Sequence, residues 1–151
     1  MTNFSVRFRR PDLRSAVIRY IRRKSNEEVF VGLIGAIVGK EKEEVRFIID
    51  DLLPFTNHDD DPEHNFSVSD DWLETLKEYC LLKYDDPRTR PLGFLHSHAV
   101  GPRRPSKRDL GFAKSLSDEE GLSLMLIANK KGAISAFLSR PKKMTKIKIL
   151  D

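Results

Sequence analysis

The chain has 151 residues, of which 39% are hydrophobic and 33% are charged, and its formal net charge is +4. This length supports one substantial hydrophobic core, so we expect a single domain over residues 1–151. No apolar run approaches the roughly 18 residues that suggest a membrane span, and Met1–Arg7 lacks the pattern of a signal peptide. Because Cys80 is the single cysteine, no internal disulfide can form, and we expect a cytoplasmic protein with no membrane partner.

The basic residues gather in a few short segments: Arg7–Arg10, Arg19–Lys24, Arg103–Arg108 and Lys142–Lys148. Such patches can bind nucleic acid. Acidic residues are interleaved with them, however, and the aromatic residues are not grouped as a platform for stacking bases. Nucleic-acid binding is therefore the less favoured interpretation.

The first half of the chain alternates between strand and helix patterns. Phe4–Phe8 alternates apolar and polar residues as a half-buried strand does. Pro11 suits the first turn of a helix, and the apolar residues after it recur at helical spacing. Val29–Val38 is an apolar run rich in β-branched residues, which predicts a central strand buried on both faces. Val45–Pro54 predicts the next strand, so the two form a hairpin.

The second half continues the same alternation after a polar loop over residues 55–68. A helix is expected up to about Lys83, and a buried strand begins at Leu92. Another helix follows Ser106 and ends at Gly121. Three final strands are expected, over residues 122–129, 133–138 and 146–150. The last of these is expected to be an edge strand. This order predicts an α/β fold with a mixed central β-sheet flanked by helices.

Two histidines, a serine and an aspartate stand at an informative spacing near residue 100. His96 and His98 end the predicted strand, and side chains two apart on a strand point to the same face. Ser106 and Asp109 stand at the start of the next helix, where residues three apart are neighbours. Two imidazoles and one carboxylate can therefore converge, leaving a fourth tetrahedral position open as in a catalytic zinc site.

Each element of this pattern has a simpler explanation when it is taken alone. A single histidine on a strand is more often a packed or surface residue than a ligand. Ser106 and Asp109 also have the spacing of a capping box, in which the two residues satisfy the free amides of a helix start. The combination of His-Ser-His, seven residues, and Ser-x-x-Asp is far more specific than any of its parts.

This combination resembles the signature of the JAMM (MPN-plus) zinc metalloproteases, in particular a small stand-alone prokaryotic member. The resemblance implies the JAB/MPN fold, which is similar to that of cytidine deaminases. It also implies an upstream catalytic glutamate. Glu28 is followed by apolar residues and by Gly35 seven positions on, as in the family's glutamate-led strand. Glu27 is the alternative, and for either residue a solvated charge beside a strand is the simpler interpretation.

The loop over residues 55–68 contains a second group of metal-ligand residue types. They are His58, Asp59, Asp60, Asp61, Glu63 and His64. We interpret this group as a solvated loop, because it lacks an ordered scaffold on either side that could hold the ligands in place. Pro54, Asn57 and Phe66 nevertheless resemble the family's connection at this point.

The resemblance implies a zinc hydrolase with one catalytic Zn²⁺ held by His96, His98 and Asp109. Glu28 is then the general base, and Ser106 stabilises the oxyanion. The implied substrate is a peptide or isopeptide bond after the Gly-Gly tail of a ubiquitin-like or sulfur-carrier protein. Two alternatives stay open: release of an amino acid such as cysteine from a sulfur carrier, and a non-catalytic scaffold of the same fold.

The loop between the metal-ligand residues is where substrate contacts are expected. Arg103 and Arg104 could meet an acidic surface of the modifier or a backbone carbonyl, and solvent-exposed charge explains them equally well. Ala99 departs from the family pattern, since many members carry proline directly after the second histidine. Pro102 and Pro105 still restrict this loop.

Overall fold

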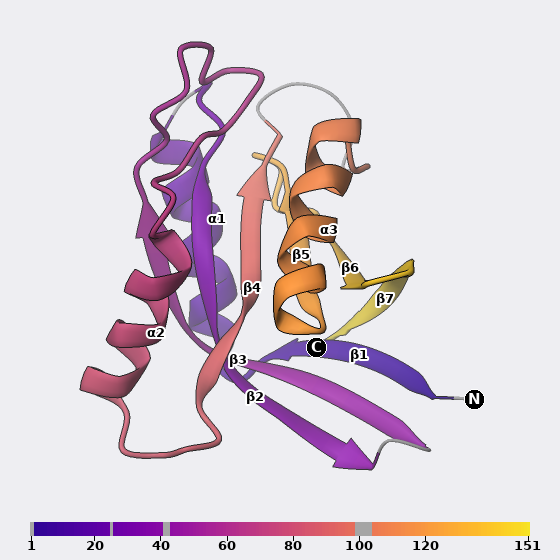
Figure 1. Ribbon diagram of the computed structural model, residues 1–151. Helices are drawn as coiled ribbons and strands as arrows, with labels where there is room; N and C mark the ends of the chain where they lie inside the picture. Colours follow the sequence, from indigo (N-terminus) through magenta and orange to yellow (C-terminus); the bar gives the residue numbers. More distant parts are fainter. Residues whose placement is uncertain (1, 25, 41–42, 99–103) are drawn as a thin grey trace.

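The structure is a computed structural model that describes residues 2–24, 26–40, 43–98 and 104–151 (Figure 1). The order of its elements agrees with the order expected from the sequence. The strands are β1 (Asn3–Phe8), β2 (Phe30–Lys40), β3 (Glu44–Phe55), β4 (Arg90–Ser97), β5 (Ser123–Ala128), β6 (Ile134–Arg140) and β7 (Lys143–Leu150). The helices are α1 (Pro11–Arg23), α2 (Trp72–Lys83) and α3 (Lys107–Glu120).

The strands form one mixed sheet in the order β1-β3-β2-β4-β5-β6-β7, and this sheet closes on itself. The predicted β2–β3 hairpin is confirmed as an antiparallel pair, while β4 and β5 are parallel. The expectation that residues 146–150 form an edge strand is wrong. β7 pairs with β6 on one side and, through residues such as Lys148 opposite Ser5, with β1 on the other. The first and last strands therefore meet, and the sheet leaves no edge there.

Helices cover both faces of the sheet, as the sequence predicts. On one face α1 buries Leu13, Val17, Ile18 and Ile21 in a core cluster that also receives residues of all the strands. On the other face α2 and α3, which Figure 1 shows on either side of β4, both pack on a second cluster rich in aromatic side chains. No helix in the described part of the chain is long and apolar enough to cross a membrane.

The strand that leads to the candidate site lies unusually close to its neighbour. Gly93 of β4 has a φ of 147°, and a Cβ built on it would lie 1.9 Å from the carbonyl oxygen of Leu124 in β5. No other residue type fits this backbone and this approach. The glycine thus sets how β4 runs beside β5 on its way to His96.

A polar cluster on β3 fixes α2 to the sheet. The Asp51 carboxylate accepts hydrogen bonds from the Tyr84 hydroxyl, from Lys83 Nζ at 2.9 Å and from the Tyr79 hydroxyl at 3.0 Å. Burial by itself would raise the pKa of Asp51, but these donors and the Leu52 amide hold it below its usual value of 3.8. The ionised form is therefore the one that the fold stabilises.

We predict that Asp51→Asn lowers the free energy of unfolding at neutral pH by about 1–2 kcal/mol, because hydrogen bonds to a charged but partly solvated group are lost. Since the folded pKa lies below the unfolded one, this stabilisation is present above about pH 4 and is lost as pH falls. Urea unfolding between pH 3 and 7 measures both effects. Tyr84→Phe is the matched control, which removes one donor and keeps the charge. An unchanged acid slope in Asp51→Asn would contradict the assignment.

Candidate metal centre

The end of β4 delivers both motif histidines to the same place. His96 pairs with Phe30 of β2 and with Ile127 of β5, and its side chain is fully buried. His98 lies one residue beyond β4, where its amide donates to the Ala128 carbonyl at 3.0 Å, so the chain stays extended. The two imidazole rings have centroids 4.9 Å apart. The side chains of His96 and His98 therefore point to the same side, as the strand pattern predicts.

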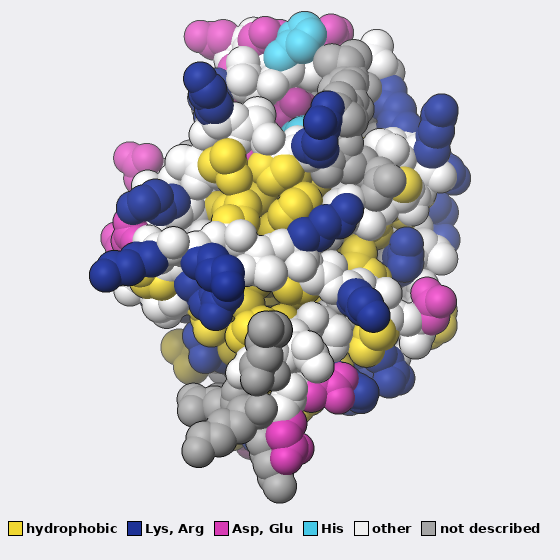
Figure 2. Space-filling view, turned by 90° about the vertical axis from the view of Figure 1, so that its right-hand side faces the viewer, with side chains coloured by type: hydrophobic (Ala, Val, Ile, Leu, Met, Phe, Trp, Pro, Cys, Tyr) yellow, Lys and Arg dark blue, Asp and Glu magenta, His cyan; other side chains and the backbone are white. Residues whose placement is uncertain are grey.

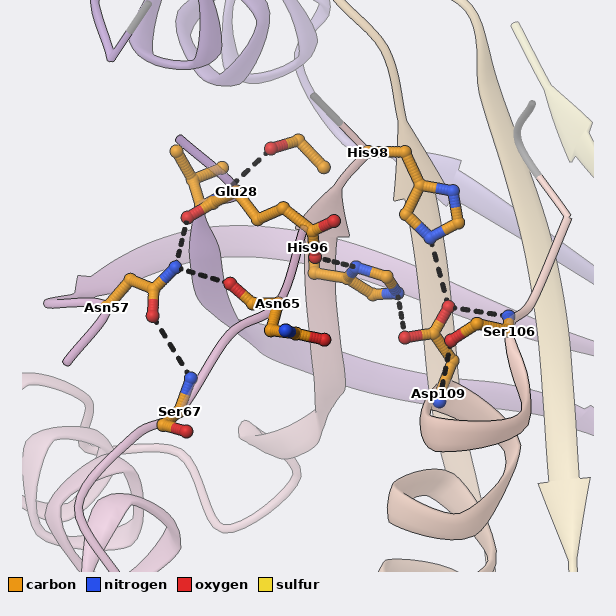
Figure 3. Close-up of polar contacts among 10 residues, drawn as sticks. Glu28, Asn57, Asn65, Ser67, His96, His98, Ser106 and Asp109 are labelled. Atoms are coloured by element: carbon orange, nitrogen blue, oxygen red, sulfur yellow. Dashed lines mark hydrogen bonds and ion pairs between the residues drawn. The ribbon is translucent and has the colours of Figure 1, made fainter. Parts of the chain in front are cut away.

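The first turn of α3 supplies the carboxylate. Ser106 is the N-cap: its Oγ accepts from the Asp109 amide at 3.1 Å, and its own amide donates to Asp109 Oδ2 at 2.8 Å. This is a complete capping box, so the structural interpretation of the two residues is correct. The same geometry turns Asp109 toward the histidines, with Oδ1 3.4 Å from His96 Nε2 and Oδ2 3.0 Å from His98 Nε2 (Figure 3). Capping and ligation are therefore compatible.

The three side chains fit a metal ion. Their candidate ligand atoms all lie within 4.8 Å of one another. Within the described part of the chain, both ring nitrogens of His96 are buried without a hydrogen-bond partner, which is costly unless another group satisfies them. Burial would raise the pKa of Asp109, but the imidazoles of His96 and His98 hold it well below its usual range. An ionised carboxylate and an unsatisfied imidazole suit a divalent cation.

Glu28 lies beside this cluster and Glu27 does not. The Glu28 side chain is buried, with Oε1 3.9 Å from His96 Nδ1, whereas Glu27 is exposed. Burial raises the pKa of Glu28 from 4.5 to about 7, against the opposing effect of His98. A carboxyl group with this pKa can both accept and return a proton near neutral pH. Between the two glutamates, the structure therefore favours Glu28 as the residue able to act at the site.

Asn57 holds the backbone of Glu28 in place. Its Nδ2 donates to the carbonyls of Glu28 and Asn65, each at 2.9 Å, and its Oδ1 accepts from the amides of Asp59 and Ser67 (Figure 3). The Glu28 amide in turn donates to the Pro62 carbonyl at 2.6 Å. The sequence singled out Asn57 only through the family resemblance and gave it no role. Its position three residues after Pro54, in a loop rich in Asx-turn residues, was the available signal.

The loop over residues 55–68 differs from what the sequence suggested. The absence of an ordered scaffold was the reason for setting aside its metal-ligand residues, and this reason is wrong, because side-chain and backbone hydrogen bonds order the loop. Its histidines and acids still do not converge. Among the described residues, the group that could hold a metal is His96, His98 and Asp109. The loop instead forms a wall of the site.

A pocket of about 470 Å³ opens over the candidate metal centre. Its lining joins Glu28, His98, Ser106 and Asp109 to residues of the 55–68 loop and of the segment before α3. That lining includes Arg104, as the sequence suggested, and also the following residues that sequence reasoning missed: His64, Asn65, Phe66, Pro105 and Arg108. Arg103 and Ala99 lie outside the described residues.

The chain is thus an α/β protein with a candidate metal centre between the end of β4 and the start of α3. The chain belongs to the family described as prokaryotic homologs of the JAB domain, whose family model matches residues 11–140. The predicted resemblance is thus confirmed. The JAB domain family includes metalloproteases. In this chain, His96, His98 and Asp109 could hold a metal ion.

Solved structures agree on the fold. The solution structure of protein DSY2949 from Desulfitobacterium hafniense is similar, with a TM-score of 0.67 and 20% sequence identity. The similarity covers 97% of this chain and 91% of that chain. At this identity the likeness shows the fold alone. No curated protein matches the chain.

We predict that zinc stabilises the protein through His98. At a zinc concentration about a hundredfold above its dissociation constant, binding to the folded state contributes about 2.7 kcal/mol, which raises the melting temperature. His98→Ala should abolish this shift, and His58→Ala, in the neighbouring loop, should keep it. Differential scanning calorimetry with and without zinc, together with metal analysis, measures the effect. An equal shift in wild type and His98→Ala would contradict the ligand assignment.

A second prediction concerns Asn57. Asn57→Ala removes one hydrogen bond that joins the loop to the Glu28 carbonyl and three hydrogen bonds within the loop. Amides near residues 57–67 and around Glu28 should therefore exchange with solvent about tenfold faster or more. Hydrogen–deuterium exchange at neutral pH measures this. Asn26→Ala, whose side chain accepts only from an exposed lysine, is the control. Unchanged protection in Asn57→Ala would show that the loop is held by other contacts.

Proposed function

We propose that the protein is a zinc-dependent hydrolase that cleaves the amide bond after the C-terminal Gly-Gly of a ubiquitin-like or sulfur-carrier protein. The observation that carries the proposal is the convergence of His96, His98 and Asp109 beside the buried Glu28, whose pKa burial raises to about 7. Of these residues, Glu28, His98 and Asp109 line one open pocket. Two imidazoles and a carboxylate form a ligand set that suits zinc and leaves a position for water or substrate. Glu28 stands next to these ligands as a buried carboxyl group, which is the position that a general base needs.

A zinc ion held by His96, His98 and Asp109 would supply Lewis-acid chemistry, which polarises a carbonyl and lowers the pKa of water to about 7. The protein's own groups supply the proton transfers. Glu28 accepts a proton from the attacking water and returns it to the leaving nitrogen, so that the C–N bond breaks and a carboxylate and an amine result. Its raised pKa allows both steps.

Ser106 is placed to stabilise the charge that develops on the carbonyl oxygen. Its hydroxyl oxygen accepts from the Asp109 amide, which leaves the hydroxyl proton available, and the residue lines the pocket. A hydroxyl that already caps a helix is held in one orientation, so little reordering is needed during the reaction. Asp109, which Ser106 orients through its amide, stays a ligand throughout.

We take the substrate class from the family resemblance. Gly-Gly is extended and without side chains, so its selective recognition requires a channel that excludes bulkier residues. The acceptor is either the amine of another protein, as in an isopeptide, or a single amino acid such as cysteine. We retain both as substrates at this stage, and we propose a cytoplasmic location for the reaction.

We predict that Glu28→Gln abolishes hydrolysis and keeps zinc. Loss of a general base commonly lowers the rate by about a hundred- to ten-thousandfold, while the metal ligands remain. Cleavage of a fusion that joins a ubiquitin-like domain to a second domain through Gly-Gly, followed by metal analysis of the same sample, tests this. Glu27→Gln is the matched control and should stay active. Full activity in Glu28→Gln would refute the proposed mechanism.

For Ser106, two substitutions separate capping from catalysis. Ser106→Ala should lower kcat by about a hundred- to a thousandfold and also destabilise the protein by about 1 kcal/mol, because an oxyanion donor and a helix cap are both lost. Ser106→Asp keeps a capping oxygen without a hydroxyl proton, so it should recover stability and remain slow. Steady-state kinetics and thermal unfolding together measure this. Recovery of activity in Ser106→Asp would assign the residue to capping alone.

A further inference from the structure

The pocket over the candidate metal centre has a positively charged rim that hydrolysis itself does not use. Arg104, Arg108 and His64 line the same pocket as Glu28 and Asp109. His64 contacts the Asp61 carboxylate at 3.1 Å, so its charge is balanced locally. The two arginines stand on the segment that leads into α3 and in its first turn, next to Asp109. Their guanidinium groups need a different explanation.

Arg108 is held in position by an acid that is itself fixed. Its Nη2 donates to Asp59 Oδ2 at 3.2 Å. The same carboxylate accepts from the Ser67 hydroxyl at 2.7 Å and from the Asp61 amide at 2.9 Å. Although Asp59 is nearly covered, the Arg108 side chain stays 56% exposed. The loop therefore orients Arg108 at the pocket and leaves more than half of its side chain exposed to another partner.

Arg104 adds a second guanidinium to the rim. It is exposed, and no carboxylate among the described residues forms an ion pair with it. An arginine presents its donors in a planar fork that matches a carboxylate. Two arginines that line the same pocket, one of them oriented by Asp59, offer hydrogen-bond donors to a carboxylate of the substrate.

We propose that Arg104 and Arg108 bind the free α-carboxylate of a single amino acid that follows Gly-Gly in the substrate. This inference rests on the proposed function and selects between its two acceptors. In a C-terminal residue, the carboxyl carbon is two bonds from the nitrogen that leaves, so the carboxylate stays inside the pocket when the scissile bond reaches the metal. In a lysine isopeptide, four methylene groups follow the leaving nitrogen, and they offer nothing for two arginines to bind.

The chemistry on the other side of the bond supports the same choice. The Gly-Gly tail carries no side chain, so it offers no carboxylate for the arginines to bind. A carboxylate bound beside the metal centre also discriminates against internal peptide bonds, which have no charge at that position. The site would thus remove one terminal residue and leave longer extensions intact.

Binding of short peptides to the zinc-free protein tests the inference without cleavage. The probes are Ala-Ala-Gly-Gly-Ala as free acid and as C-terminal amide, titrated by two-dimensional NMR. We expect the acid to bind about tenfold more tightly than the amide, the effect of one or two partly exposed charged hydrogen bonds. Arg108→Ala and Arg104→Ala should each reduce this preference. Lys107→Ala removes an exposed charge that does not line the pocket, and it should keep the preference.

Two results would overturn the inference. One is equal affinity of acid and amide for the wild-type protein. The other is an arginine-dependent gain in affinity when the amide peptide carries a glutamate before Gly-Gly, which would place the carboxylate on the modifier. Hydrolysis is scored separately with the zinc-loaded protein. A preference for the acid without cleavage of any peptide or Gly-Gly fusion would contradict the proposed function and leave the carboxylate site standing.

Discussion

The Asp109 carboxylate is the group on which the candidate site depends. It is buried, it faces two imidazoles, and its own backbone and side chain close the first turn of α3 through Ser106. A buried carboxylate is stable only when hydrogen bonds and opposite charges surround it. The same contacts therefore cap α3, set its direction and orient the Asp109 carboxylate. The close packing of β4 on β5 at Gly93 in turn places the two histidines beside that carboxylate.

The same reasoning explains why the irregular loop over residues 55–68 belongs to the site. Glu28 precedes β2 and has no strand partner to fix its backbone, so its amide and carbonyl are held by Pro62 and Asn57. A loop that holds a buried acid beside a metal centre has to be ordered itself. Its turn residues provide that order by bonding neighbouring amides. The acids that looked like a rival metal site thus act as loop structure, and Asp59 extends this role to Arg108.

Much of this organisation could be predicted from the sequence, for identifiable reasons. The two periodicities fixed the order of strands and helices, and the His-Ser-His to Ser-x-x-Asp spacing brought the ligand residues together, because strand alternation and the helix turn are local rules. Closure of the sheet could not be predicted, since pairing of β7 with β1 joins residues at opposite ends of the chain. The roles of Asn57 and Arg108 were missed for the same reason: each depends on a partner at least 29 residues away in sequence.

The balance of charge in the pocket links the chemistry to substrate choice. Glu28 and Asp109 place negative charge at the metal side, while Arg104 and Arg108 place positive charge at the rim. A free α-carboxylate near the metal centre would be repelled by Glu28 unless cations held it apart, so the arginines and the general base have to be considered together. The Asp59 contact holds Arg108 to the loop, so the loop helps to set where this positive charge lies. A pocket arranged in this way can use a carboxylate for recognition while keeping Glu28 free to move a proton.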